Sequence, residues 1–297
     1  MNAAAPADDP PGAAPRAAAP TLAPGAVFAG LRIERLLARG ASASLYVAVD
    51  RRTRRRCALK VLDALDADAA GDDAPASHFT REAQALRQLR HASIVEVLAA
   101  GVEGTRPYLV MELLPGGDLR RYTSAARLLP ELLVLRLGAA VADALAHAHA
   151  MGFVHRDLKP ANLVFDPATQ RVWVTDFGVA HAVDAVRTRT GVLLGTPSFM
   201  PPEQLAGGAP APAGDVYALA VTLFQLLTGA LPYDGQTMGA LLRAMAQGAT
   251  RTLAELRPDL PPALGELLAQ ALSRDAAQRP TAADFARRLG AMTAPPA

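Results

Sequence analysis

Lysine is rare in this chain of 297 residues, and the positions of its two lysines give the first indication of chemistry. Lys60 and Lys159 are the only lysines among 30 basic residues, and Asn162 is the only asparagine besides Asn2. An ammonium is a compact point charge with three donors, whereas a guanidinium is a planar fork. A chain that otherwise uses arginine is expected to keep lysine where chemistry demands an ammonium, with chance scatter of a rare residue as the alternative.

Three short stretches collect the remaining candidates. "VHRDLKPANLVF" (154–165) holds His155, Arg156, Asp157, Lys159 and Asn162 in one loop, and "VTDFGVA" (174–180) follows with Asp176. "LARGASASLYVAV" (37–49) reads like a glycine-rich phosphate loop in which alanine replaces two glycines. A Walker-type phosphate loop is excluded, because Gly-Lys-Ser/Thr occurs nowhere in the sequence.

Composition limits the class of protein. The chain is 51% hydrophobic, enough for one large or two small domains, and its net charge of +2 gives no global case for nucleic-acid or membrane binding. A single cysteine, Cys57, excludes an intramolecular disulfide, fits a reducing compartment and is expected to be a small core residue. No signal peptide is apparent, so we expect a cytoplasmic location. The apolar stretch 216–231 is shorter than the roughly 20 residues of a membrane span and predicts a buried core helix.

The order of predicted elements indicates two unequal parts. An Ala/Pro-rich segment (1–25) and a short tail (291–297) flank the rest, and we expect the first to be disordered. Strand patterns occur at 28–40, 44–50, 56–63, 94–103 and 107–114, with helical spacing at 77–91. A long amphipathic helix is predicted over 130–152, and helices and loops fill the chain from about 200. A small strand-rich part therefore precedes a larger helical part.

Four motifs of this chain, taken together and in their order along the sequence, resemble those of the eukaryotic-type serine/threonine protein kinases, in their bacterial style. The H-R-D-L-x-x-x-N and D-F-G segments are intact, "CALK" (57–60) resembles V-A-I-K, and "PPEQ" (201–204) resembles A-P-E with Pro201 replacing alanine. The resemblance covers about residues 30–290. It implies an α+β, two-lobed fold within a kinase domain at 26–290. Its N-lobe (about 26–112) would be a small antiparallel sheet with one main helix, and its C-lobe (about 117–290) mainly helical.

The resemblance also assigns roles to the rare residues. It implies that Lys60 contacts the α- and β-phosphates of ATP, held by Glu82, for which a solvated helix face is the alternative. Asp157 resembles the catalytic aspartate that orients the substrate hydroxyl, with Lys159 near the transferring phosphate. Asn162 and Asp176 resemble the ligands of Mg²⁺, with Mn²⁺ as a second candidate ion. Both lysines and the one asparagine beyond the tail thus fall on these positions.

The nucleotide site follows from the same resemblance. Met111 corresponds to the gatekeeper, and backbone groups of Glu112 and Leu114 would hydrogen-bond adenine. Asp118 is interpreted equally well as a ribose ligand or as a helix N-cap. Alanine stands at positions 38 and 43, where glycine is expected. This predicts that the loop over ATP is stiffer and that KM for ATP is raised without loss of binding. The remaining residues expected at ATP are Leu37, Arg39, Gly40, Ala41, Ser42, Ser44, Leu45, Ala58 and Lys60.

The loop after Asp157 indicates the substrate class, and the segment from Asp176 to Glu203 indicates regulation. Lys159-Pro160 resembles serine/threonine rather than tyrosine kinases, and Thr196 would bridge Lys159 and Asp157. Thr188 and Thr190 are expected phosphorylation sites, whose phosphate could pair with Arg156. Two further positions resemble structural features of the family. Glu203 and Arg279 match its buried ion pair, and Asp215 matches the residue that caps the catalytic loop.

We therefore expect an autophosphorylating serine/threonine kinase that uses Mg²⁺-ATP on protein substrates, itself included as a dimer in trans. A nucleotide-binding pseudokinase scaffold is the alternative, supported by the altered glycine loop. A small-molecule phosphotransferase is disfavoured by the intact segment from Asp176 to Glu203. The basic run 51–56 is interpreted as a solvated turn and not a nucleic-acid site. His147 and His149 are two apart on a helix, which makes a metal pair improbable, and His155 is interpreted as structural.

Overall fold

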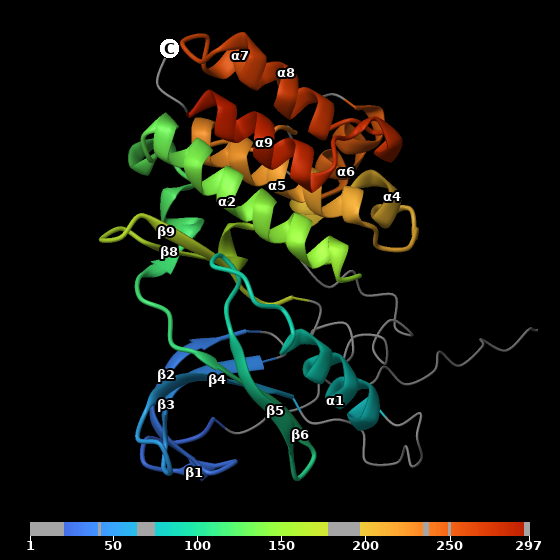
Figure 1. The fold of residues 1–297 in the computed structure, drawn as a ribbon. Coiled ribbons are helices and arrows are strands. Elements are labelled where there is room, and N and C mark those ends of the chain that lie inside the picture. Colours follow the sequence, from blue (N-terminus) through green and yellow to red (C-terminus); the bar gives the residue numbers. More distant parts are fainter. Residues whose placement is uncertain are drawn as a thin grey trace, which may run out of the picture.

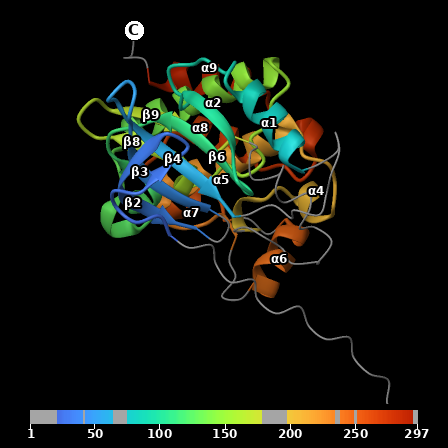
Figure 2. The same cartoon turned by 90° about the horizontal axis from the view of Figure 1, so that it is seen from below.

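The computed structural model describes residues 21–40, 43–63, 75–177, 197–233, 238–248 and 251–293. Figure 1 shows two lobes, with strands β1 to β6 and helix α1 in one lobe and the remaining helices in the other. Seen from below, the strands of the first lobe lie in front of the helical lobe, with α1 beside them (Figure 2). This arrangement is the two-lobed α+β architecture that the motifs predicted.

The N-lobe is built on one antiparallel sheet of order β1-β2-β3-β4-β6-β5. Its strands are β1 (Val27–Phe28), β2 (Leu31–Arg39), β3 (Ala43–Asp50), β4 (Arg56–Leu62), β5 (Val97–Glu103) and β6 (Arg106–Glu112). Branched and aromatic side chains such as Ile33, Tyr46 and Leu59 are fully buried on one face. This apolar face gives the sheet a core of its own, separate from that of the C-lobe.

Helix α1 (Pro75–Leu86) packs mainly against β5 and β6. Phe79, Ala83 and Leu86 are buried, as their helical spacing predicted. The predicted end at residue 91 was wrong, because the chain leaves the helix after Leu86 through two tighter i→i−3 hydrogen bonds. Leu89 is nevertheless buried, so its apolar character belongs to the turn that follows α1.

The C-lobe is built around three packed helices, α2 (Glu131–Ala150), α5 (Pro212–Thr228) and α9 (Ala282–Met292). Nearly every residue of α5 is buried, which confirms the core helix expected from 216–231. In the described part of the chain, α2 alone is long and apolar enough to span a membrane, but half of that stretch is buried, as in a core helix. The other C-lobe helices are α4 (Pro202–Leu205), α6 (Met238–Gln247), α7 (Leu253–Leu256) and α8 (Pro262–Ala271).

Several short elements lie near the boundary between the lobes. A three-stranded sheet joins β7 (Gly117–Asp118), β8 (Leu163–Asp166) and β9 (Arg171–Val174), in that order. The 3₁₀ turns beside it are η1 (Leu119–Tyr122), η2 (Ala125–Arg127) and η3 (Pro160–Asn162), with η5 (Pro197–Phe199) and η6 (Ala276–Gln278) farther along. The segment between α1 and β5 reaches across to β9, where Val95 N donates to Val174 O at 3.0 Å and Val174 N donates to Ser93 O at 2.9 Å.

Candidate active site

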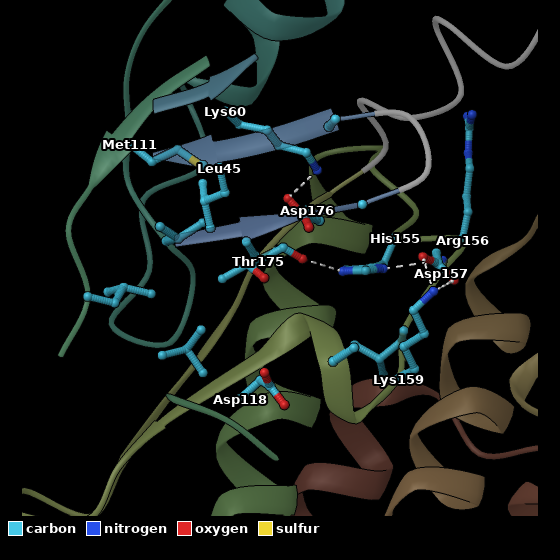
Figure 3. Close-up of a pocket in the computed structure, with 18 of the residues that line it drawn as sticks. Leu45, Lys60, Met111, Asp118, His155, Arg156, Asp157, Lys159, Thr175 and Asp176 are labelled. Carbon is cyan, nitrogen blue, oxygen red and sulfur yellow. Dashed lines mark hydrogen bonds and ion pairs between the residues drawn. The ribbon is translucent and has the colours of Figure 1, made fainter. Parts of the chain in front are cut away.

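A cleft of about 890 Å³ lies between the lobes. The N-lobe wall is formed by β2, β3 and β4, the back by β6, and the floor by the loop 154–162 and the residues after β9. Figure 3 shows Lys60 from β4, Asp157 and Lys159 from the loop 154–162, and Asp176 from the residues after β9, all at this cleft. The two lysines of the chain therefore line the same cleft, although they are 99 positions apart in the sequence.

Lys60 and Asp176 form the ion pair at the centre of the cleft. Lys60 Nζ, on β4, donates to Asp176 Oδ1 at 2.7 Å. Burial raises the pKa of the Asp176 carboxyl, but the charge and hydrogen bond of Lys60 outweigh it and hold the pKa below its usual value. An ionised Asp176 is therefore present at neutral pH.

The predicted partner of Lys60 was different. Among the described residues, Lys60 makes no ion pair with Glu82, which lies half-buried on α1. Lys60 Nζ donates instead to the Asp176 carboxylate, which lies 2.7 Å away. The expectation that Glu82 holds Lys60 is thus corrected for this structure, in which Asp176 holds it.

The loop 154–162 arranges Asp157 between two donors. Lys159 Nζ lies 2.9 Å from Asp157 Oδ1 and 2.8 Å from Oδ2. Asn162 Nδ2 donates to the backbone oxygen of Asp157 at 2.7 Å and to its Oδ2 at 3.1 Å. Asp157 itself is exposed, so its carboxylate faces the solvent from which a substrate would arrive.

Asp215 holds this loop from below. It is only 2% exposed near the start of α5, and it accepts hydrogen bonds from the backbone N–H groups of His155 (2.8 Å) and Arg156 (2.9 Å). His149 Nε2, on α2, donates to the same carboxylate at 2.8 Å. Arg156 has a positive φ of 72°, a conformation that costs energy for a residue with a side chain, and these hydrogen bonds fix it.

His155 links the loop to the segment that carries Asp176. Its Nε2 donates to the carbonyl of Thr175 at 2.8 Å, and its Nδ1 accepts from Asp157 N at 3.3 Å (Figure 3). These partners assign a neutral ring with the proton on Nε2. The ring also packs 4.7 Å from that of Phe177. His155 therefore positions two acidic residues of the cleft, Asp157 and Asp176, through the backbone.

The back of the cleft has an apolar wall suited to a flat base. Met111 on β6 is buried beside Ala58 on β4, its paired residue in the sheet, and Leu45 lines the same space. Leu114 lines the cleft just after β6. The Glu112 side chain turns to the backbone instead, where its Oε1 accepts from Glu96 N at 2.9 Å, and burial raises its carboxyl pKa.

Leu37, Ala38, Gly40 and Ala43 also line the cleft, from β2, β3 and the turn between them. Ala38 pairs with Leu45 and Arg39 with Ser44, and Gly40 N donates to Ala43 O at 2.8 Å. Neither alanine has a positive φ, so both fit their positions without backbone strain. Ala41 and Ser42 lie outside the described residues.

Asp118 forms the N-cap of η1 and lines the cleft. Its Oδ1 accepts from Arg120 N at 3.0 Å and Arg120 Nε at 2.8 Å, and its Oδ2 accepts from Arg120 Nη2 at 2.7 Å. The N-cap interpretation is therefore observed, and the position in the cleft keeps the ribose role as a prediction.

An ion pair lies beside the cleft, next to Gln204, which lines it. Arg279 donates to both oxygens of Glu203, at 2.6 and 2.8 Å, and its side chain is completely buried over the ring of Tyr217. This two-pronged contact ties α4 to the turn after α8. Thr188, Thr190 and Thr196, which the sequence placed in the segment before α4, lie outside the described residues.

The donor set fits a divalent cation. The Asn162 nitrogen is used in bonds to Asp157, which leaves its amide oxygen as an acceptor, and Asp176 adds an ionised carboxylate. Both are hard oxygen ligands of the kind that Mg²⁺ prefers beside substrate phosphates. No cluster of three or more His, Cys, Asp or Glu side chains that could hold a metal occurs among the described residues.

The sequence did not single out several residues of this site. His149 was considered only as a metal ligand, and Thr175 was not considered, because their contacts join elements far apart in the chain. Arg120 was also missed, although its spacing of two from Asp118 was a readable signal. Cys57 is buried as expected, and its pKa is raised to about 11 by burial.

Known proteins share this fold and resemble this sequence. A sequence model of the family described as Protein kinase domain matches residues 31–288. The crystal structure of Rad53 1-466 in complex with AMP-PNP superposes with a TM-score of 0.73 at 25% identity, covering 87% of this chain and 64% of that chain. The chain therefore belongs to the protein kinase family and has its fold, as the motifs predicted.

Several relatives are bacterial serine/threonine kinases. PkaB of Streptomyces coelicolor is 41% identical over 231 residues, 75% of this chain and 54% of that protein. PknL of Mycobacterium bovis is 35% identical over 248 residues, 83% and 61% of the two chains, respectively. PrkC of Bacillus subtilis is 34% identical over 245 residues, 82% and 37%. The chain thus matches between 37% and 61% of the length of these curated relatives.

Proposed function

We propose that this chain is a serine/threonine protein kinase, which transfers the γ-phosphate of ATP to serine and threonine hydroxyls of proteins. The observation that carries the proposal is the meeting of Lys60, Asp157, Lys159, Asn162 and Asp176 in one cleft. Phosphoryl transfer needs in-line positioning and neutralised phosphate charge more than covalent help. These residues supply a base, two ammonium groups and a metal-ligand pair.

Asp157 orients the substrate hydroxyl and accepts its proton. Lys159 and Asn162 keep the carboxylate in one orientation, because both donate to it. Lys159, as an ammonium 2.8 Å from Asp157, is also placed to attract the transferring phosphate. His155 and Asp215 fix the backbone beneath, so that little reorganisation is needed during transfer.

Lys60 binds the α- and β-phosphates, and Asn162 and Asp176 hold Mg²⁺, with Mn²⁺ as a substitute. When bound, the cation neutralises phosphate charge. Adenine occupies the apolar wall of Leu45, Ala58 and Met111, with the backbone of Glu112 and Leu114 as its hydrogen-bonding edge. The relative Rad53 was crystallised with AMP-PNP, which is consistent with a nucleotide in this cleft.

Regulation and location are further parts of the proposal. Autophosphorylation of Thr188 or Thr190 by a second copy would add roughly −1.5 to −2 charges, which Arg156 can bind. Such a role fits signal transduction in the cytoplasm. The pseudokinase alternative rested on the altered glycine loop. The unstrained φ angles of Ala38 and Ala43 weaken it.

Transfer of labelled γ-phosphate to the chain itself, with and without Mg²⁺, tests the proposal. We expect incorporation in the wild type, mapped to Thr188 or Thr190, and none in Lys60→Met or Asp157→Asn. ATP binding with no Mg²⁺-dependent transfer up to millimolar ATP would instead support a scaffold.

A further inference from the structure

The charged groups of the cleft are unequally engaged. Each carboxylate that lines it already accepts hydrogen bonds from a cation or a backbone N–H. These carboxylates are Glu112, Asp118, Asp157, Asp176 and Asp215. Arg35 and Arg156 also line the cleft, and neither forms an ion pair with any residue that the structure describes. The charged side chains of the cleft that stay available to a ligand are therefore the cationic ones, Arg35 and Arg156.

Arg120 determines the sign of the charge at one wall. Its Nε and Nη2 cover both oxygens of Asp118, while its side chain is 68% exposed and its Nη1 has no bond to Asp118. The hydrogen bond from Arg120 is also the main reason that the pKa of Asp118 is lowered, so the pair is fully ionised at neutral pH. An arriving ligand meets a guanidinium at this wall, and the carboxylate behind it is neutralised.

This wall adjoins the loop that performs the chemistry. Arg120 lies in η1, which packs against η3, and η3 lies between Lys159 and the end of the catalytic loop at Asn162. Arg120 and Asp157 line the same cleft, so a peptide whose hydroxyl reaches Asp157 would have Arg120 on a neighbouring wall. Opposite charges at a solvated rim attract modestly, and they act mainly on encounter and selectivity.

We propose that Arg120 is a specificity-determining residue, which makes the enzyme prefer protein segments with acidic residues beside the serine or threonine. The inference rests on the proposed function and names its substrate class. A basic segment would need an available carboxylate at this wall, and Arg120 occupies the one that is there. Removal of Arg120 alone leaves Asp118 without its cation, so that this wall presents a negative charge in place of an outward guanidinium.

Three peptides that share one central threonine test the inference. Their flanks carry glutamate, arginine or uncharged residues, and kcat/KM is measured with the full chain at saturating Mg²⁺-ATP. The wild type is expected to prefer the acidic peptide over the basic one by about fivefold, which corresponds to the upper end of the range for one exposed ion pair. The preference is expected to shrink in 0.5 M salt, because the charges are exposed.

Arg120→Ala is expected to lower the acidic-to-basic ratio by about fivefold or more, since it removes an attraction and frees Asp118. Arg121→Ala is the matched control, because this neighbouring arginine does not line the cleft, and its ratio should stay within twofold of wild type. Arg120→Ala combined with Asp118→Asn should lose the acidic preference without gaining a basic one. Thermal unfolding of each variant shows whether the fold is intact.

Equal or better use of the basic peptide by the wild type would overturn the inference, as would equal shifts in the Arg120 and Arg121 variants. Failure of the proposed function looks different, because no peptide would then be phosphorylated at all. In that case, fluorescence anisotropy with alanine in place of the threonine still decides the binding preference. Tighter binding of the acidic peptide, lost in Arg120→Ala, would support the inference, and equal binding would refute it.

Discussion

Lys60 Nζ and Asp176 Oδ1 lie 2.7 Å apart, although 116 residues separate them in the sequence. Lys60 belongs to the N-lobe sheet, and Asp176 follows β9 in the C-lobe. The ion pair therefore joins the two lobes at the point where the phosphates of a nucleotide are proposed to bind. Each group is also proposed to bind that nucleotide or its cation, and the pair would then be a preformed part of the site.

Lys60→Arg separates charge from geometry at this position. The variant keeps a cation for Asp176, so we expect its midpoint of thermal unfolding to stay close to that of wild type. The planar guanidinium does not reproduce a compact ammonium, and we expect kcat for phosphate transfer to fall at least about 10²-fold. Transfer near the wild-type rate would contradict the assigned role of Lys60.

Asp215→Asn tests the support of the catalytic loop. The Asp215 carboxylate has two acceptor oxygens, which accept from three donors. The asparagine amide has only one acceptor oxygen, so a buried N–H is left without its partner. We expect the free energy of unfolding in urea to fall by about 1.5–3 kcal/mol, together with kcat. Asp259→Asn is the control, since Asp259 is an exposed partner of Arg257 and should cost less than about 1 kcal/mol. Equal losses in both variants would refute the role of Asp215.

The Glu203–Arg279 pair predicts a pH dependence of stability. Burial raises the pKa of Glu203, but the Arg279 hydrogen bond outweighs it and lowers the pKa below the usual 4.5. A depressed carboxyl pKa stabilises the fold above the unfolded value, and this contribution is lost as pH falls through the folded value. The difference in the free energy of unfolding between wild type and Glu203→Gln should therefore be constant above about pH 4.5 and should shrink as the pH falls below that value.

Urea unfolding of both proteins at several pH values between 7 and 3 measures this gap. Asp284→Asn, on the exposed side of α9, is a suitable control for the general effect of acid. A gap that persists or widens toward pH 3 would show that the contribution of Glu203 does not depend on its charge.

Ala38→Gly combined with Ala43→Gly tests the phosphate loop. The sequence predicted a raised KM for ATP from these alanines, and the structure gives neither of them a positive φ. Because no strain is relieved, we expect KM for ATP to fall by less than about threefold with little change in kcat. A tenfold fall in KM would mean that the alanine side chains keep the loop away from the phosphates.

The sequence predicted best what depends on neighbours in the chain. Asp157, Lys159 and Asn162 lie within six residues, so one loop places them together whatever the rest of the fold does. The strands of the N-lobe and the burial of α5 followed from hydrophobic patterns. In contrast, the end of α1 was misplaced, because Leu89 continues the apolar face after the helix has turned.

Contacts between distant elements could not be predicted in the same way. The carboxylate that holds Lys60 is Asp176, which lies 116 positions further along the chain and after β9, and no local pattern carries that information. His149 and Asp215 likewise meet only because α2 and α5 pack together. The Arg120–Asp118 pair is local, but two interpretations of Asp118 were equally compatible with the sequence.

The most direct test of the central claim is phosphate transfer to an added protein by wild type and by Asp157→Asn, measured at equal ATP occupancy. Because Asp157 is exposed, the asparagine variant should fold and bind ATP as the wild type does. We predict Mg²⁺-dependent labelling of serine and threonine by the wild type, and a loss of at least about 10²-fold in the variant. Equal labelling by both proteins, or none by either with ATP bound, would contradict the account of Asp157 as the base of a protein kinase.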